Sequence, residues 1–119
     1  MIRVYREEIS AKYQQETNCP FVKIRLPDKS YILPTVREVR DWMDNFAVQP
    51  YVPESNDCDN RALLLTAHFS GKGWAFGWAS IGLHDICTFL SEKKEIWFVE
   101  PSNCIIYPPD VNLTWLVMP

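Results

Sequence analysis

The sequence has no apolar run approaching the roughly 20 residues that a membrane-spanning helix requires. Residues 1–6 also lack the apolar stretch that forms the centre of a secretory signal. These two absences predict a cytoplasmic protein with no membrane partner.

A surplus of positive charge is absent as well. The formal net charge is −3, and the basic residues are scattered along the chain without forming a stripe or a patch. Proteins that bind nucleic acids usually carry a concentrated basic surface. We therefore expect no nucleic-acid partner.

Paired cysteine motifs are missing too, because Cys19, Cys58, Cys87 and Cys104 show no CxxC spacing. Without that spacing and without a secretory signal, neither a zinc knuckle nor disulfides are expected, and the four thiols are predicted to be free. A zinc site built from His84 and three of the cysteines is the alternative. On one strand, however, His84 and Cys87 would point to opposite faces, which favours Cys87 as a core residue.

What is present indicates one globular domain, residues 1–119, since 47% of the residues are hydrophobic and 13% are aromatic. Apolar spacing predicts β-like segments at 1–10 and 19–32, a helix at 36–46 capped by Thr35, a loop at 49–56, a helix at 58–69, and strands at 74–80, 83–90, 95–100, 105–107 and 111–118. This order predicts an α+β fold, with N-terminal helices packed on a C-terminal antiparallel sheet.

The helix at 58–69 begins with a thiol. Asp57 is its predicted N-cap, which places Cys58 in the first turn, with Ala62, Leu65 and Phe69 on the same face. Backbone N–H groups and the helix dipole favour an anion there, so the nucleophilic thiolate becomes more accessible. A small buried cysteine with a capping Asp57 is the simpler interpretation.

His84 and Glu100 lie on two strands that flank a charged hairpin tip, residues 91–94. A tip centred on Glu92 would place the two side chains directly opposite each other on one face, with Cβ atoms roughly 5 Å apart. Glu100 would then orient the imidazole of His84. A nucleophile, a base and an orienting group in this chain order are compatible with a catalytic triad, which is defined by geometry.

The segments around these three residues resemble a known family. Asp57–Ala62 (DCDNRA), residues 74–79 (WAFGWA), His84 and residues 96–101 (IWFVEP) are similar to small papain-like, transglutaminase-like cysteine-peptidase domains of bacterial and phage proteins and of a mushroom agglutinin. In this family, the motifs at the positions of Cys58, His84 and Glu100 carry the nucleophile, the base and the acid, respectively.

The resemblance implies a papain-like fold and a catalytic triad of Cys58, His84 and Glu100. The backbone N–H of Cys58, with Gln49 or Asn56, would form the oxyanion hole, and Asp85 would raise the pKa of His84. No cofactor is required, although the family likeness allows calcium; Asp57, Asp59 and Asn60 offer oxygens but lack the spacing of an EF-hand loop.

Two functions follow from these observations. The first is a cysteine hydrolase or acyl-transferase acting on a peptide, isopeptide or amide. The second is a non-catalytic binding or inhibitor protein on the same fold, encoded by a phage or a mobile element. The expected partner is a peptide or protein in both cases, and the sequence does not fix the oligomeric state.

Overall fold

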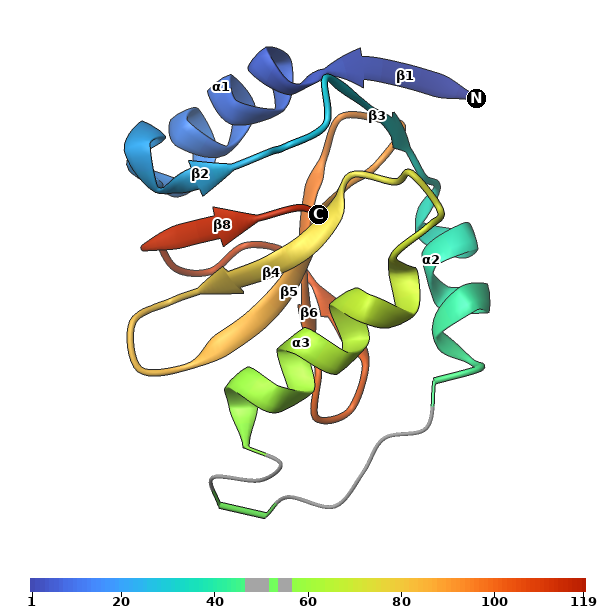
Figure 1. Cartoon of the computed structure of the whole chain (residues 1–119), viewed down its shortest axis with the longest axis vertical. Helices are drawn as coiled ribbons and strands as arrows, with labels where there is room; N and C mark the ends of the chain where they lie inside the picture. The colour runs from blue at the N-terminus through green and yellow to red at the C-terminus, as the bar shows by residue number, and fades with distance from the viewer. Residues whose placement is uncertain (47–51, 54–56) are drawn as a thin grey trace.

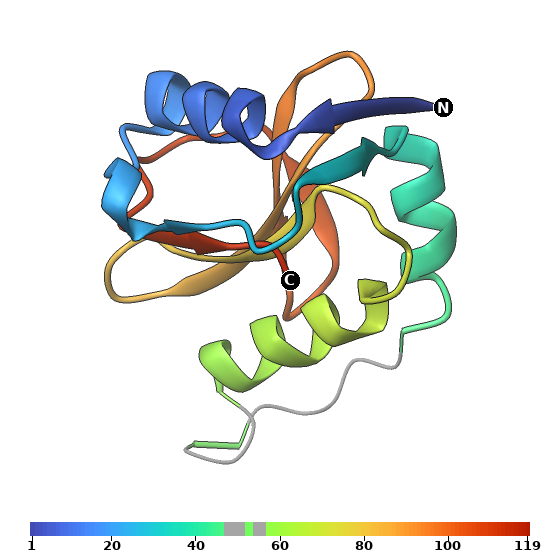
Figure 2. The same ribbon diagram turned by 45° about the horizontal axis from the view of Figure 1, so that its top comes forward.

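In the computed structural model, which describes residues 1–46, 52–53 and 57–119, a central sheet lies between helices on its two faces (Figures 1 and 2). The elements are β1 (Ile2–Tyr5), α1 (Arg6–Thr17), the 3₁₀ helix η1 (Phe21–Lys23), β2 (Ile24–Arg25), β3 (Ser30–Leu33), α2 (Val36–Met43), α3 (Cys58–Phe69), β4 (Phe76–Ser80), β5 (Asp85–Leu90), β6 (Ile96–Glu100), β7 (Ile105–Tyr107) and β8 (Trp115–Val117). The predicted α+β class is confirmed. None of the helices in the described ranges has the length and apolar character needed to cross a bilayer.

The main sheet has the strand order β2-β8-β4-β5-β6-β7. Strands β4 to β8 pair antiparallel, as predicted for the C-terminal part of the chain. The N-terminal strand β2 joins the edge of this sheet parallel to β8, while β1 and β3 form a separate antiparallel pair. The β-like segment predicted at 19–32 thus supplies an edge strand of the main sheet.

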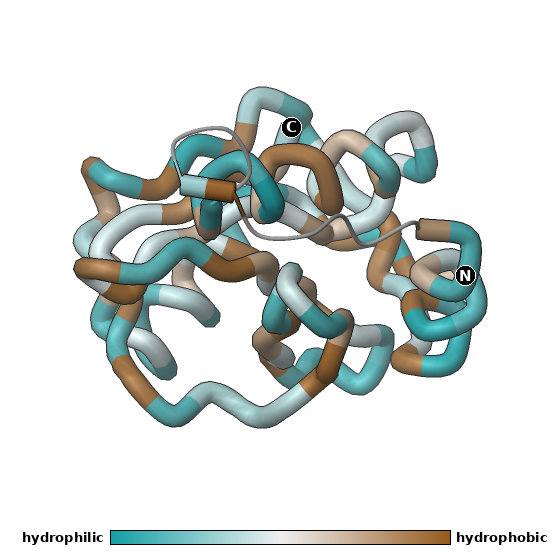
Figure 3. Tube along the Cα trace, turned by 90° about the horizontal axis from the view of Figure 1, so that it is seen from below, coloured by the Kyte–Doolittle hydropathy of each residue, from teal (hydrophilic) through white to brown (hydrophobic). Residues whose placement is uncertain are grey.

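Strand β5 occupies the centre and is covered on both faces. Ile86 and Leu90 belong to the core that includes α1, whereas Cys87 and Phe89 belong to the core under α2 and α3. Figure 3 shows hydrophobic and hydrophilic residues following one another at short intervals along the chain, as expected where elements have one buried side. The two helical layers thus hold β5 in a fixed position.

The helices predicted at 36–46 and 58–69 are present as α2 and α3. Helix α2 begins at Val36 after a capping box between Thr35 and Glu38, and α3 begins at Cys58 after a capping box between Asp57 and Asn60. These boxes satisfy backbone N–H groups that a helix otherwise leaves without acceptors.

The β-like segment predicted at 1–10 is a strand only at Ile2–Tyr5, because residues 6–10 belong to a helix that continues to Thr17. Only Ile9 and Tyr13 supply large buried apolar side chains there, so the apolar spacing is too sparse to reveal a helix. The helical propensity of its Glu, Lys, Gln and Ala residues, together with burial of Tyr13, accounts for the helix. The Tyr13 hydroxyl bonds Thr88 Oγ1 at 2.8 Å and so links α1 to β5.

The register of the β5–β6 hairpin also differs from the prediction. Pairing of Cys87 with Val99 and of Leu90 with Ile96 centres the hairpin on Lys93, one residue beyond the expected Glu92. The cause is Lys94, whose positive φ of 61° permits a three-residue tip closed by the bond from Ser91 N–H to Glu95 O at 2.9 Å. Glu100 is therefore offset diagonally from His84, on the same face.

Gly77 brings β4 and β8 into close approach. A Cβ atom at this position would lie 2.0 Å from Val117 O and 2.7 Å from the Met118 side chain. Only glycine fits here, and β8 consequently packs directly on β4.

Candidate active site

A pocket of about 340 Å³ lies where α3 begins, β5 begins and β6 ends. Its lining residues are Cys58, Arg61, Leu83, His84, Glu100 and Ser102. The three residues predicted as nucleophile, base and orienting group thus meet in one hollow, although they come from three different elements.

His84 and Glu100 form the best-defined contact of the pocket. His84 Nε2 lies 2.7 Å from Glu100 Oε2, and the other carboxylate oxygen accepts the Ser102 N–H at 3.3 Å. Because an ionised carboxylate only accepts hydrogen bonds, Nε2 carries the proton in this pair. The remaining ring nitrogen, Nδ1, then has a lone pair that can accept a proton from a thiol.

Cys58 is half-buried and occupies the first turn of α3. The first N–H groups of a helix point away from its end and favour negative charge, which suits a thiolate. Two acidic residues flank it, and a hydrogen bond with Asp57 raises the pKa of exposed Asp59.

The other three thiols have a different setting. Burial raises the pKa of Cys19 to about 11, that of Cys87 to about 12, and that of Cys104 above its ordinary value. Cys87 is fully buried, and its Sγ lies 3.4 Å from the main-chain oxygen of Ala62. Its predicted place in the core is confirmed, and none of the three lines the pocket.

Asp85, another predicted site residue, does not line the pocket. Asp85 Oδ2 accepts the indole N–H of Trp78 at 3.1 Å, so its carboxylate is engaged on β4. Gln49 and Asn56, the predicted oxyanion-hole residues, lie outside the described residues.

Three lining residues were not predicted as site residues, namely Arg61, Leu83 and Ser102. Arg61 lies three positions after Cys58 on α3, a spacing that puts two side chains on the same helix face and was available in the sequence. Leu83 and Ser102 depend on the β4–β5 turn and on the chain after β6, and no sequence pattern reveals these.

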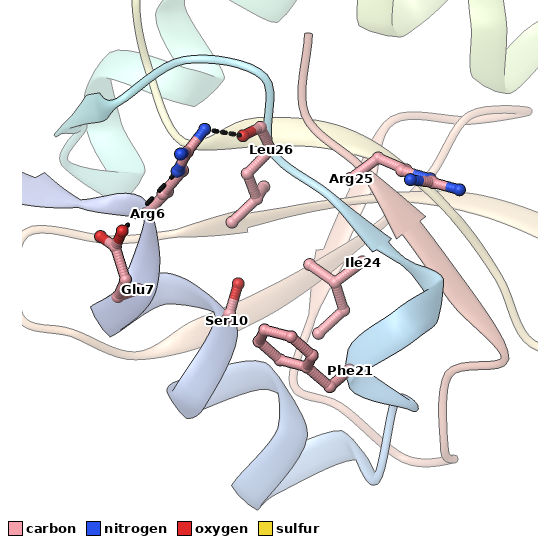
Figure 4. A pocket seen from close by; sticks show the side chains of 7 residues that line it. All are labelled: Arg6, Glu7, Ser10, Phe21, Ile24, Arg25 and Leu26. Atoms are coloured by element: carbon pink, nitrogen blue, oxygen red, sulfur yellow. Dashed lines mark hydrogen bonds and ion pairs between the residues drawn. The ribbon is translucent and has the colours of Figure 1, made fainter.

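No group of three or more His, Cys, Asp or Glu side chains within the described ranges is arranged to hold a metal ion. A larger hollow, of about 430 Å³, lies between α1 and β2 (Figure 4). There Arg6 bonds Leu26 O at 3.5 Å and pairs with Glu7, and the lining contains neither a thiol nor a histidine. Its size alone therefore does not indicate a catalytic site.

Comparison with known proteins gives one informative result. No family model matches the chain, and no curated protein matches it. A solved structure described as the PSL1a–E64 complex matches with a TM-score of 0.86 at 15% identity, over 97% of this chain and 50% of that chain. The chain thus spans about half the length of that protein and shares the fold of that half.

Proposed function

We propose that this protein is a cysteine hydrolase or acyl-transferase acting on a peptide, isopeptide or amide bond through Cys58, His84 and Glu100. The observation that carries the proposal is the His84–Glu100 pair at 2.7 Å in the pocket that Cys58 also lines. The shared fold adds support, because the matched structure is a complex with E64, a cysteine protease inhibitor.

The first half of the reaction forms a thioester. His84 Nδ1 takes the proton of Cys58, and the thiolate sulfur attacks the substrate carbonyl carbon. The backbone N–H of Cys58, at the first position of α3, can donate to the developing oxyanion. Protonated His84 then gives its proton to the leaving amine, and the C–N bond breaks.

The second half releases the acyl group. His84 removes a proton from water in a hydrolase, or from an acceptor amine in a transferase, and the resulting nucleophile breaks the C–S bond. The thiol of Cys58 is restored when the proton returns. Glu100 holds the imidazole in one tautomer throughout and stabilises its protonated form.

A burst experiment with p-nitrophenyl acetate tests this proposal. Wild-type protein should release about one equivalent of p-nitrophenolate rapidly as Cys58 becomes acetylated, a product that peptide mass spectrometry locates. Cys58→Ser and His84→Ala should lose the burst. A wild-type protein with no burst, and with acetylation no faster than in His84→Ala, would refute the triad and favour the non-catalytic binding protein.

A further inference from the structure

Leu83 is the most exposed large apolar residue of the described chain, with a relative exposure of 104%. It lines the same pocket as Cys58 and His84 and directly precedes His84. The exposed leucines of α3, Leu63 and Leu64, are only about half as accessible, at 50% and 47%. A complete leucine side chain is thus presented to solvent beside the candidate base.

The turn that carries Leu83 is tightly held. Residues 81–84 connect β4 to β5, with Gly82 and Leu83 at the centre of a turn closed by the bond from Ile81 N–H to His84 O at 3.0 Å. Gly82 has the positive φ, 107°, that such a turn requires at its first position. Leu83 therefore needs no special backbone conformation, and the turn does not explain the choice of leucine.

Buried Ser80 anchors this turn to the sheet. Its Oγ accepts the Gly82 N–H at 3.2 Å, and its backbone oxygen accepts the Thr114 N–H at 2.8 Å. A fixed backbone holds the leucine at the rim of the pocket without a large loss of mobility on binding. Polar residues are usual at such hairpin tips, because apolar surface there remains in water.

We propose that Leu83 binds an apolar side chain of the substrate, next to the carbonyl group that Cys58 attacks. The inference rests on the proposed function and names its substrate class: a peptide or amide with an apolar residue beside the reacting bond. A pocket of about 340 Å³ is at the small end of ligand sites and suits one side chain with its carbonyl group.

Two alkylating agents with the same reactive group test the inference. Iodoacetamide reports the reactivity of Cys58 without an apolar contact, whereas N-hexyliodoacetamide adds an apolar chain that Leu83 can contact. The measured quantity is the rate of Cys58 alkylation by N-hexyliodoacetamide divided by its rate with iodoacetamide, normalised by the same ratio for glutathione. For the wild-type protein this normalised ratio should be about five, because the hexyl chain covers apolar area on Leu83.

Three variants make the result specific. Leu83→Asn should reduce the normalised ratio to about one, Leu83→Met should preserve it, and Leu63→Asn should leave it unchanged as the matched control on α3. Full exposure of Leu83 predicts unaltered thermal melting in its variants. A wild-type ratio near one, or a ratio that Leu83→Asn leaves intact, would overturn the inference.

The two proposals fail separately in this experiment. If His84→Ala slows the iodoacetamide reaction while the hexyl preference is absent, Leu83 has no such role and the triad stands. If the hexyl preference is present but His84→Ala has no effect on either rate, the pocket binds apolar groups without an activated thiol.

Discussion

The pocket at the start of α3 and the packed interface of α2, α3 and β5 each contain one histidine and one cysteine. In the pocket, His84 is 40% exposed and pairs with a carboxylate, and Cys58 is half-buried. In the interface, His68 Nε2 donates to Trp42 O at 2.7 Å and its ring stacks on Trp42, while Cys87 is sealed under α3.

This difference shows how the surroundings of a histidine and a cysteine separate a role in packing from a role in chemistry. His68 Nε2 donates a hydrogen bond to the main-chain oxygen of Trp42. Its ring also contacts the aromatic rings of Trp42, Phe46 and Phe69. His84 bonds the Glu100 carboxyl group at 2.7 Å and lines open space. The pocket differs from the interface in that its histidine and its cysteine both line this open space.

The largest expected contrast is between the two thiols themselves. Because burial raises the pKa of Cys87 to about 12, only about one Cys87 in ten thousand is ionised at pH 8. Cys58 should therefore react with iodoacetamide at least about a hundredfold faster in the native protein. Peptide mass spectrometry over a time course measures both rates, and equal rates would remove the distinction between the two regions.

Replacing His84 or His68 by alanine should have different effects on the alkylation rate of Cys58. His84→Ala removes the proton acceptor and should slow alkylation of Cys58 near pH 7 by about thirtyfold. His68→Ala is the matched control and should leave that rate unchanged. If the two variants show the same alkylation rate, His84 does not activate the thiol.

The same pair of variants should differ in stability in the opposite sense. His68→Ala loses a part-buried hydrogen bond and an aromatic stack, which together predict a decrease of about 1.5 kcal/mol in the free energy of unfolding. His84→Ala should change it by less than about 0.5 kcal/mol, since the ring is partly solvated. Urea denaturation measures both, and a larger loss for His84→Ala would assign it a structural role.

The smallest expected effect belongs to Glu100→Gln. An amide retains the shape of the side chain but not its charge, so protonated His84 loses stabilisation and alkylation of Cys58 should slow about threefold near neutral pH. The rate should be measured against pH beside Glu95→Gln, a carboxylate outside the pocket, whose profile should coincide with that of wild type. A Glu100→Gln profile that superimposes on wild type would leave Glu100 without an orienting role.

The sequence predicted the parts of this site that depend on local signals. Asp57 before an apolar helical stripe correctly located the first turn of α3, and therefore Cys58. The predicted proximity of His84 and Glu100 is confirmed by the 2.7 Å contact of their side chains, although His84 precedes β5 instead of lying on it. Capping and strand alternation act within a few residues, and for this reason they can be read from one sequence.

The parts that the sequence did not predict depend on tertiary structure. Helix α1 is stabilised by burial of Tyr13 against β5, which its polar composition conceals. The hairpin register depends on a lysine with positive φ, an unusual conformation for that residue type. The Ser102 N–H reaches Glu100 only because the chain turns back after β6, so its part in orienting the carboxylate has no sequence signature.

The position of β8 between β2 and β4 has a consequence for the order of events during synthesis. Residues 24–25 have no partner in the main sheet until residues 115–117 have emerged from the ribosome and settled against Gly77. The early strand must wait, unpaired, until residues 26–114 have also been made. A pause in translation shortly before residue 115 would therefore prolong the period in which this strand is open to pairing with another chain.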